Sequence, residues 1–154
     1  MHHIIRTQVE WDELLTIGNN DIVEIDTART IICNDKTGAA YNNIDILRVK
    51  NGYVELYIRF NEVVVRGNAC VLATSGNIHL YDSSTGTFCG DCKVTARDKS
   101  FVFASRKCVI NAYDSSFTTA GLSSWDLQKD EVTVIAHHQT VSLDCRGNTK
   151  VMRV

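Results

Sequence analysis

The sequence predicts an all-β protein: a single parallel β-solenoid with about 16 residues per coil (two octads), capped by a short N-terminal helix. Three observations predict this fold. Apolar residues alternate in short runs between turn-forming residues, they recur every eight residues, and short motifs recur at multiples of 16. The 154 residues include no proline, as expected where nearly every strand N–H is bonded to a neighbouring coil.

A helix is predicted before the first strands. Thr7 and Glu10 have the spacing of a capping box and precede an apolar helical pattern that ends at a glycine. We therefore expect a helix over residues 7–17. The predicted organisation is an N-terminal helical cap (1–18) followed by the β-solenoid (19–154), together one domain.

The repeat of 16 follows from paired motifs. Tyr-Asp-Ser-Ser occurs at 81–84 and 113–116, and Arg-Gly-Asn occurs at 66–68 and 146–148. The shifts are 32 and 80, both multiples of 16 and neither a multiple of 24. Two octads therefore form one coil with two short strands, stacked on its neighbours at about 4.8 Å. Six to seven such coils would form a rod roughly 30 Å long.

Stacking every 16 residues predicts four inward ladders, two on each wall of the solenoid. One wall would contribute Val54, Cys70, Gly86, Val102, Thr118, Val134 and Leu56, Leu72, Phe88, Ala104, Ala120, Ala136. The opposite wall would contribute Ile44, Phe60, Gly76, Cys92, Cys108 and Ile46, Glu62, Ile78, Val94, Ile110. The many small side chains predict a thin core. The apolar positions slip by one near residues 122–127, where we expect a bulge.

The two ends of the rod are expected to differ. The helix would cover one end, because open solenoid ends need a cap. At the other end, residues 150–154 form an apparent strand with no strand after it in the sequence. An uncovered strand edge pairs readily with another chain, so we expect a homodimer formed through this C-terminal edge.

Composition excludes several classes of protein. Hydrophobic residues make up 44% and charged residues 22%, with a net charge of −2, which argues against a disordered chain or a basic nucleic-acid-binding tail. The N-terminus lacks the apolar core of a secretory signal, and no run of about 18 apolar residues would span a membrane. Six cysteines are too few for a disulfide scaffold, which predicts reduced thiols and a cytoplasmic location.

One column of the repeat is rich in aspartate. It consists of Arg66, Asp82, Asp98, Asp114, Asp130 and Arg146, one residue every 16. The favoured interpretation is turn chemistry, because Asp side chains bond nearby backbone N–H groups and tolerate tight corners. A cation site or a catalytic carboxylate pair are the alternatives. The absence of long loops to form a substrate cleft argues against an enzyme.

No metal, cofactor or catalytic site is predicted from the other reactive residues. Cys89 and Cys92 form a single CxxC without the second pair of ligands that a zinc site needs, so we interpret them as structural. His79, His137 and His138 fall in different columns and are expected to be surface residues. Phosphate-binding and nucleophile motifs are absent from the sequence.

Two outward surfaces are candidate contact sites. The first is apolar and comprises Val71, Phe101, Phe103, Phe117 and Ile135, a composition that usually marks an interface unless another segment covers it. The second lies beside the aspartates and comprises Tyr81, Arg97 and Tyr113. Tyr and Arg are common interface anchors.

The pattern in residues 94–98 and 110–114, Val/Ile-x-Ala-x-Asp, resembles the short-repeat β-solenoid proteins of phage, prophage and gut bacteria. The resemblance covers roughly residues 52–147 and implies a solenoid. The chain is also similar to bactofilins in its period and its lack of enzymatic motifs. The aspartate column and the N-terminal helix depart from the bactofilin pattern, which argues against filament formation.

The leading functional hypothesis is a non-enzymatic module that binds a macromolecular partner, with a protein as the favoured class. The phage-like resemblance implies a specific form, a phage-encoded inhibitor of host defence such as an anti-CRISPR. The alternatives are a self-associating structural or assembly protein, and a carbohydrate-binding or carbohydrate-active β-helix that uses the aspartates. Direct nucleic-acid binding is ranked low, because the net charge is small and arginines flank the aspartate row.

Overall fold

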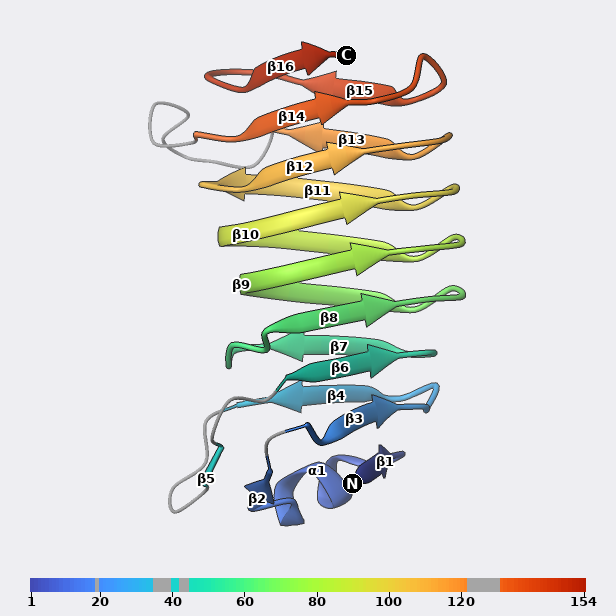
Figure 1. Cartoon of the computed structure of the whole chain (residues 1–154), viewed down its shortest axis with the longest axis vertical. Helices are drawn as coiled ribbons and strands as arrows, with labels where there is room; N and C mark the ends of the chain where they lie inside the picture. Colours follow the sequence, from blue (N-terminus) through green and yellow to red (C-terminus); the bar gives the residue numbers. More distant parts are fainter. Residues whose placement is uncertain (19, 35–39, 42–44, 122–130) are drawn as a thin grey trace.

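The computed structural model describes residues 1–18, 20–34, 40–41, 45–121 and 131–154. The chain winds into a parallel β-solenoid of about 8 turns with about 16 residues per turn (Figure 1). The predicted fold class and period are confirmed, and the number of turns is higher than the six to seven predicted. The extra turns come from the N-terminal third, where the sequence repeat is weakest.

The described part of the chain contains one helix, α1 (Gln8–Glu13). Its strands are β1 (His2–Ile5), β2 (Thr16–Ile17), β3 (Ile22–Ile25), β4 (Thr30–Cys33), β5 (Ala40–Tyr41), β6 (Ile46–Val49), β7 (Tyr53–Leu56), β8 (Glu62–Val65), β9 (Cys70–Leu80), β10 (Thr85–Ala96), β11 (Phe101–Arg106), β12 (Val109–Ala112), β13 (Phe117–Ala120), β14 (Thr133–Ala136), β15 (Ser142–Cys145) and β16 (Lys150–Arg153).

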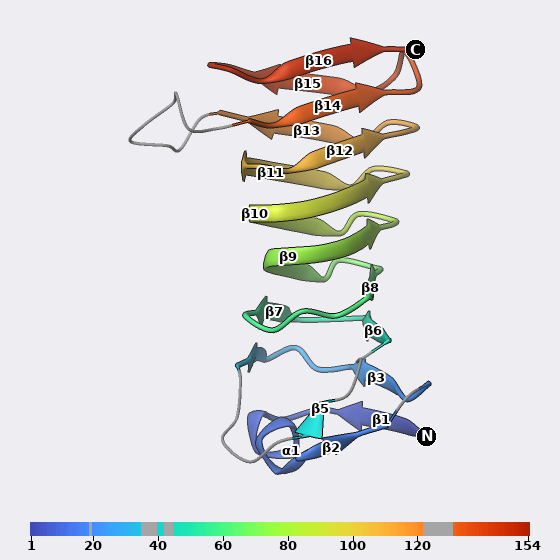
Figure 2. The same cartoon turned by 60° about the vertical axis from the view of Figure 1, so that its left-hand side comes forward.

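The strands form two facing walls. The first wall stacks β1, β3, β6, β8, the second halves of β9 and β10, β12, β14 and β16. The second wall stacks β4, β7, the first halves of β9 and β10, β11, β13 and β15. The long strands β9 and β10 bend from one wall to the other (Figure 2). All pairings are parallel, so each coil is held to the next by main-chain hydrogen bonds along its length.

The central inward ladders follow the predicted register. On the first wall Ile78, Val94 and Ile110 pair in sequence and are buried. On the second wall Gly86 pairs with Val102, and Val102 pairs with Thr118. Wherever successive coils are 16 residues long, the repeat therefore predicts which side chains face the core.

Below this region the predicted register is wrong by one residue. Val71, and not Cys70, is the buried partner of Gly86, because this step is only 15 residues long. On the first wall Val63 replaces Glu62 as the inward partner of Ile78 for the same reason.

The same slip places Ala73 inside in place of Leu72, and Leu47 inside in place of Ile46. The predicted core position Ile44 lies outside the described residues. A shift of register in the β9–β10 pairing, between Phe88 and Asp91, restores the spacing of 16.

Above the centre the predicted stacking is wrong by one octad. Val134 pairs with Ile110, 24 positions earlier, and therefore belongs to the first wall and not above Thr118. Each coil consists of two octads, so eight additional residues carry the chain to the opposite wall. The predicted bulge at residues 122–127 falls outside the described part of the chain.

The narrow core is filled by large side chains that pack against small ones. A Cβ placed on Gly86 would lie 2.3 Å from the ring of Phe88, two residues along the same strand. The ring therefore occupies the space that a larger residue at position 86 would need. Neighbouring coils contribute Val71 and Ala73 below and Val102 and Ala104 above, so the one large ring of this layer is surrounded by small side chains.

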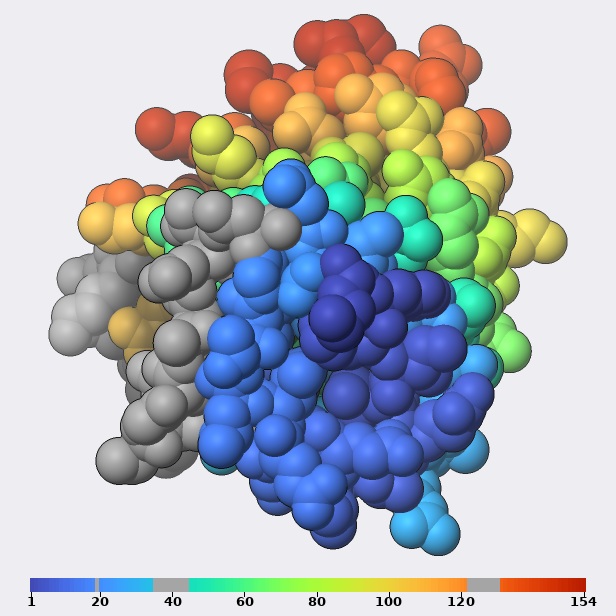
Figure 3. Space-filling view, turned by 60° about the horizontal axis from the view of Figure 1, so that its bottom comes forward, coloured from blue at the N-terminus to red at the C-terminus, as the bar shows by residue number. Residues whose placement is uncertain are grey.

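The N-terminal segment covers one end of the rod (Figures 1 and 3). The predicted capping box is present: Thr7 accepts from the Glu10 N–H, and the Glu10 carboxylate accepts from the Thr7 N–H. Trp11 is fully buried, with its ring 6.4 Å from the ring of Phe60. The helix is shorter than the predicted 7–17, because Thr16 and Ile17 pair with β5 as a strand.

Candidate functional site

Three phenylalanines form a cluster on the outer face of the second wall. Phe101 and Phe117 are paired across β11 and β13, and their rings stack with centroids 4.6 Å apart and an interplanar angle of 17°. Phe103 follows two residues after Phe101 on the same face, with its ring centroid 4.7 Å from that of Phe101. Phe103 is 44% exposed. We call Phe101, Phe103 and Phe117 the aromatic cluster.

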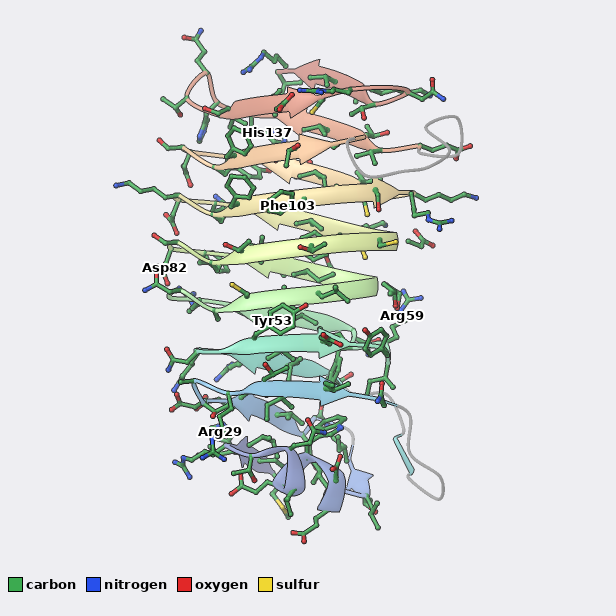
Figure 4. The ribbon with its side chains drawn as sticks, turned by 180° about the vertical axis from the view of Figure 1, so that it is seen from behind. Arg29, Tyr53, Arg59, Asp82, Phe103 and His137 are labelled. Carbon is green, nitrogen blue, oxygen red and sulfur yellow. The ribbon has the colours of Figure 1, made fainter. Side chains whose placement is uncertain are left out.

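The outward columns that contain the aromatic cluster carry no charge from β9 to β13, and the nearest carboxylates in these columns are Glu55 below and Asp144 above. Over this range the two columns consist of Cys70, Thr85, Phe101, Phe117 and Leu72, Thr87, Phe103, Thr119. Tyr53 continues the first column on β7 and is 37% exposed. Figure 4 shows Tyr53 and Phe103 over the middle of a wall and Asp82 at the edge of the rod. This face therefore offers apolar and hydroxyl groups to a partner.

Two residues predicted for this surface lie elsewhere. Val71 is buried in the core, because the 15-residue step exchanges it with Cys70. Ile135 lies on the opposite wall, because β14 pairs with β12. The apolar surface is thus narrower than predicted and is centred on the aromatic cluster. A small cavity of about 60 Å³ lies beside it, lined in part by Phe103 and Thr119.

The aspartates line the turns that follow the first wall. Asp82, Asp98 and Asp114 have φ angles of 57°, 55° and 55°, in the left-handed region that Asp tolerates better than most residues. Asp98 accepts a hydrogen bond from the N–H of Asp82, at 2.9 Å, and Asp114 accepts one from the N–H of Asp98, at 3.0 Å. Each carboxylate thereby closes the turn of the coil before it, which is the turn chemistry expected.

The ends of the aspartate column differ from the prediction. Gly67, with φ of 62°, occupies the position assigned to Arg66 and donates its N–H to Asp82. At the other end His138 accepts the N–H of Asp114 through Nδ1, at 2.7 Å. Arg146 follows β15 on the second wall and is not in this column. Asp130 lies outside the described residues.

The second predicted contact surface is a stack of alternating cations and rings. The guanidinium of Arg66 lies 4.3 Å from the ring centroid of Tyr81, and that of Arg97 lies 4.3 Å from the ring centroid of Tyr113. His137 extends this stack, with its ring parallel to Tyr113 at 4.2 Å. The sequence repeat missed Arg66 and His137, because the shortened and lengthened coils moved them out of the predicted columns.

The cysteines are free thiols in different environments. All six are free, Cys92 and Cys108 are buried, and Cys89 is exposed. A hydrogen bond with Cys108, together with burial, raises the pKa of the Cys92 thiol above its ordinary range. The same bond lowers the pKa of the Cys108 thiol, so within this buried pair Cys92 is the residue that keeps its proton.

The described residues contain neither a cluster of metal ligands nor a membrane-spanning helix. No group of three or more His, Cys, Asp or Glu among them could hold a metal ion. Within the same ranges, no helix is long and apolar enough to cross a membrane.

The arrangement as a whole offers surfaces for binding. The aspartate carboxylates are engaged in turns, the core thiols are buried, and the exposed feature of the second wall is an aromatic cluster on a rigid sheet. No protein-family model, curated protein or solved structure matches this chain.

Proposed function

We propose that this protein is a non-enzymatic binding module whose second wall engages a protein partner through the aromatic cluster. The observation that carries the proposal is the stacking of Phe101 on Phe117 beside the exposed ring of Phe103. Aromatic rings in a rigid setting bury large apolar area at little cost in conformational entropy, and they are frequent anchors of protein interfaces.

The chemistry of the partner follows from the surface around the rings. The columns that contain Phe101 and Phe103 carry no charge from β9 to β13. An ionic segment would lose its hydration there without gaining a counter-charge. The proposal is therefore a partner that presents aliphatic or aromatic side chains, one of which enters the cavity beside Phe103 and Thr119.

The carbohydrate alternative has less support. One oxygen of each of Asp82, Asp98 and Asp114 already accepts a backbone N–H, and these bonds hold the turns. A catalytic pair would need carboxylates that are free to hold or transfer a proton. If this alternative applies, Asp98→Asn with Asp114→Asn abolishes glycan binding or turnover while the aromatic variants retain it.

Substitution of the aromatic cluster tests the proposal. The full-length chain is immobilised, and partner proteins are captured on it from extracts of the cells that produce the chain. The captured partner is identified by mass spectrometry. The affinity of the purified partner for the purified chain is then measured. Phe103→Ser is expected to weaken binding about 30-fold, in line with the loss of an interface hot spot.

A matched control separates a specific site from general stickiness. Tyr57 is also an exposed aromatic residue, at 50%, but lies outside the cluster and is hydrogen-bonded to Glu55. Tyr57→Ser should leave the affinity unchanged. Equal affinity of the Phe103→Ser variant and the unsubstituted chain would overturn the proposal.

Self-association is a second candidate, favoured by one observation. All four residues of β16 are exposed, including Val151 at 44% and Met152 at 49%, although Val151 pairs with the core residue Val134. For the 154-residue chain we propose homodimerisation through this edge. An assembly role would require this contact, whereas the binding module does not.

The finer assignments stay predictions. An inhibitor of host defence encoded by a phage, such as an anti-CRISPR, is the specific form implied by the resemblance of the repeat, and a cytoplasmic location follows from the reduced cysteines. Identification of the captured partner decides between a defence protein and another host component.

A further inference from the structure

The first wall contains a hollow that the proposed function does not use. It has a volume of about 450 Å³, in the range of small-molecule sites, and lies over β3, β6 and β8. Its lining residues are Glu24, Arg48, Val49, Lys50, Glu62, Val64, Arg66 and Tyr81. The aromatic cluster is on the opposite wall, so the two surfaces are separate.

A buried carboxylate fixes the charge balance of this hollow. Glu24 is only 6% exposed, and its two oxygens contact Lys50 Nζ at 2.9 Å and His2 Nε2 at 3.5 Å. Glu24 and Lys50 therefore neutralise each other. The remaining charged residues of the lining are Arg48, Arg66 and Glu62, which leave one net positive charge.

The two arginines are placed without a carboxylate partner. The guanidinium of Arg66 lies over the ring of Tyr81, 4.3 Å from its centroid, and a guanidinium stacked on a ring can still donate its N–H groups to an anion. The side chain of Arg48 is exposed and forms no ion pair or hydrogen bond among the described residues, although Glu24 is its neighbour across β3 and β6. Lys50 lies on the same face of the chain as Arg48, with Val49 between them in the sequence. The backbone N–H of Arg66, one coil above, donates to the carbonyl of Val49. Two like charges in adjacent coils are stabilised when an anion lies between them.

From this geometry we infer that the hollow binds the phosphate group of a small phosphorylated molecule. Guanidinium groups bond phosphate oxygens in pairs, and the doubly charged group balances two arginines. Glu62, on the same rim, is placed to accept a hydrogen bond from a hydroxyl of the ligand. The volume exceeds that of a single phosphate and accommodates an attached sugar.

An extended polyanion fits this wall less well than a small ligand. Asp82 directly follows Tyr81 in the sequence, and Asp98 and Asp114 continue the row of carboxylates along the edge of the wall. A nucleic-acid strand that left the hollow in that direction would meet these carboxylates at every coil. Arg48, Lys50 and Arg66 lie together in the hollow, which favours a compact anion.

The test is a titration of the ¹⁵N-labelled full-length chain followed by NMR, with ribose 5-phosphate, inorganic phosphate and ribose as probes. Saturable shifts confined to β3, β6, β8 and Tyr81 are expected with ribose 5-phosphate, smaller ones with phosphate, and none with ribose. Arg48→Ala, which removes no side-chain hydrogen bond or ion pair of the described residues, should weaken binding about tenfold.

Arg97→Ala is the control for the loss of one arginine charge, because Arg97 stacks on Tyr113 and lies outside the hollow. It should bind as the unsubstituted chain does. Absence of saturable shifts with ribose 5-phosphate, or equal weakening by Arg97→Ala, would overturn the inference. Neither result affects capture of a protein partner through Phe103, so this inference and the proposed function can fail separately.

Discussion

The side-chain amide of Gln8 forms both hydrogen bonds that a neighbouring strand would form with Ile32. Its Oε1 accepts the Ile32 N–H at 2.7 Å, and its Nε2 donates to the Ile32 carbonyl at 3.0 Å. Ile32 lies on β4, the first strand of the second wall. One residue of the cap thus satisfies the edge of a strand that would otherwise be open to pairing.

Replacement of Gln8 is expected to expose this edge. Gln8→Leu removes both bonds and leaves a partly buried N–H and C=O unpaired, so the free energy of unfolding should fall by about 1–3 kcal/mol. Urea unfolding followed by circular dichroism measures the loss. Asp12→Ala serves as the control, because it removes only the exposed bond between Asp12 and the Gln8 amide. Equal stability of Gln8→Leu and Asp12→Ala would contradict the role assigned to Gln8.

A buried hydroxyl in the core predicts that two substitutions change the free energy of unfolding in opposite directions. The Thr118 Oγ1 is buried without a hydrogen-bond partner in the described structure, and Val102 occupies the same ladder one coil below. Thr118→Val should raise the free energy of unfolding by about 1 kcal/mol, because no hydroxyl is then desolvated. Val102→Thr should lower it by about 1–3 kcal/mol. A loss of stability in Thr118→Val would show that the hydroxyl has a stabilising role.

The pH dependence of stability should reflect Asp21. Its carboxylate is bonded to His3 Nε2 at 2.9 Å, to the N-terminal amine and to the Gly18 N–H, and these contacts hold the pKa of Asp21 well below its ordinary value. The stabilisation is therefore complete above the pKa of an unfolded aspartate, about 3.9, and is lost as the pH falls through the lower folded pKa.

Asp21→Asn removes this titrating group, so its urea midpoint should change less between pH 4 and pH 2 than that of the unsubstituted chain. Midpoints measured at intervals across this range give the comparison. Identical slopes for the two proteins would mean that other carboxylates control acid unfolding.

The exposed strand β16 predicts a dimer, and a charged side chain introduced on this strand should dissociate it. Met152→Glu places a carboxylate on this edge and should shift sedimentation equilibrium of the 154-residue chain from dimer to monomer. Val9→Glu makes the same kind of change at the opposite end, where Val9 is 61% exposed, and should leave the dimer intact. A monomer at high concentration in the unsubstituted chain would contradict this proposal.

The sequence predicted the central coils correctly and failed where the pattern no longer identified a face. Ile78, Val94 and Ile110 recur at an uninterrupted spacing of 16, and all their sequence neighbours except Val109 are polar, so one register buries them best. Residues 70–73 and 63–65 are apolar at every position. Within these runs a slip of one residue exchanges apolar for apolar, so only the charged Glu62 at a predicted inward position indicated the 15-residue step.

The same reasoning explains the outcome for the candidate site. Phe101 and Phe117 could be placed together because one regular coil separates them. Ile135 could not, because an added octad between β13 and β14 moves it to the other wall. The turn role of Asp98 follows from local chemistry, whereas the hollow lined by Arg48 and Arg66 depends on the contacts of three coils and has no sequence signature.

The central claim, that the second wall binds a protein through the aromatic cluster, is tested most directly by site-specific photo-crosslinking in cells that produce the protein. A benzophenone-bearing residue replaces Phe103 in one variant and His79, on the opposite wall, in another. A discrete protein adduct at position 103 and none at position 79 is the predicted result. An adduct at position 79 with none at position 103 would contradict the account.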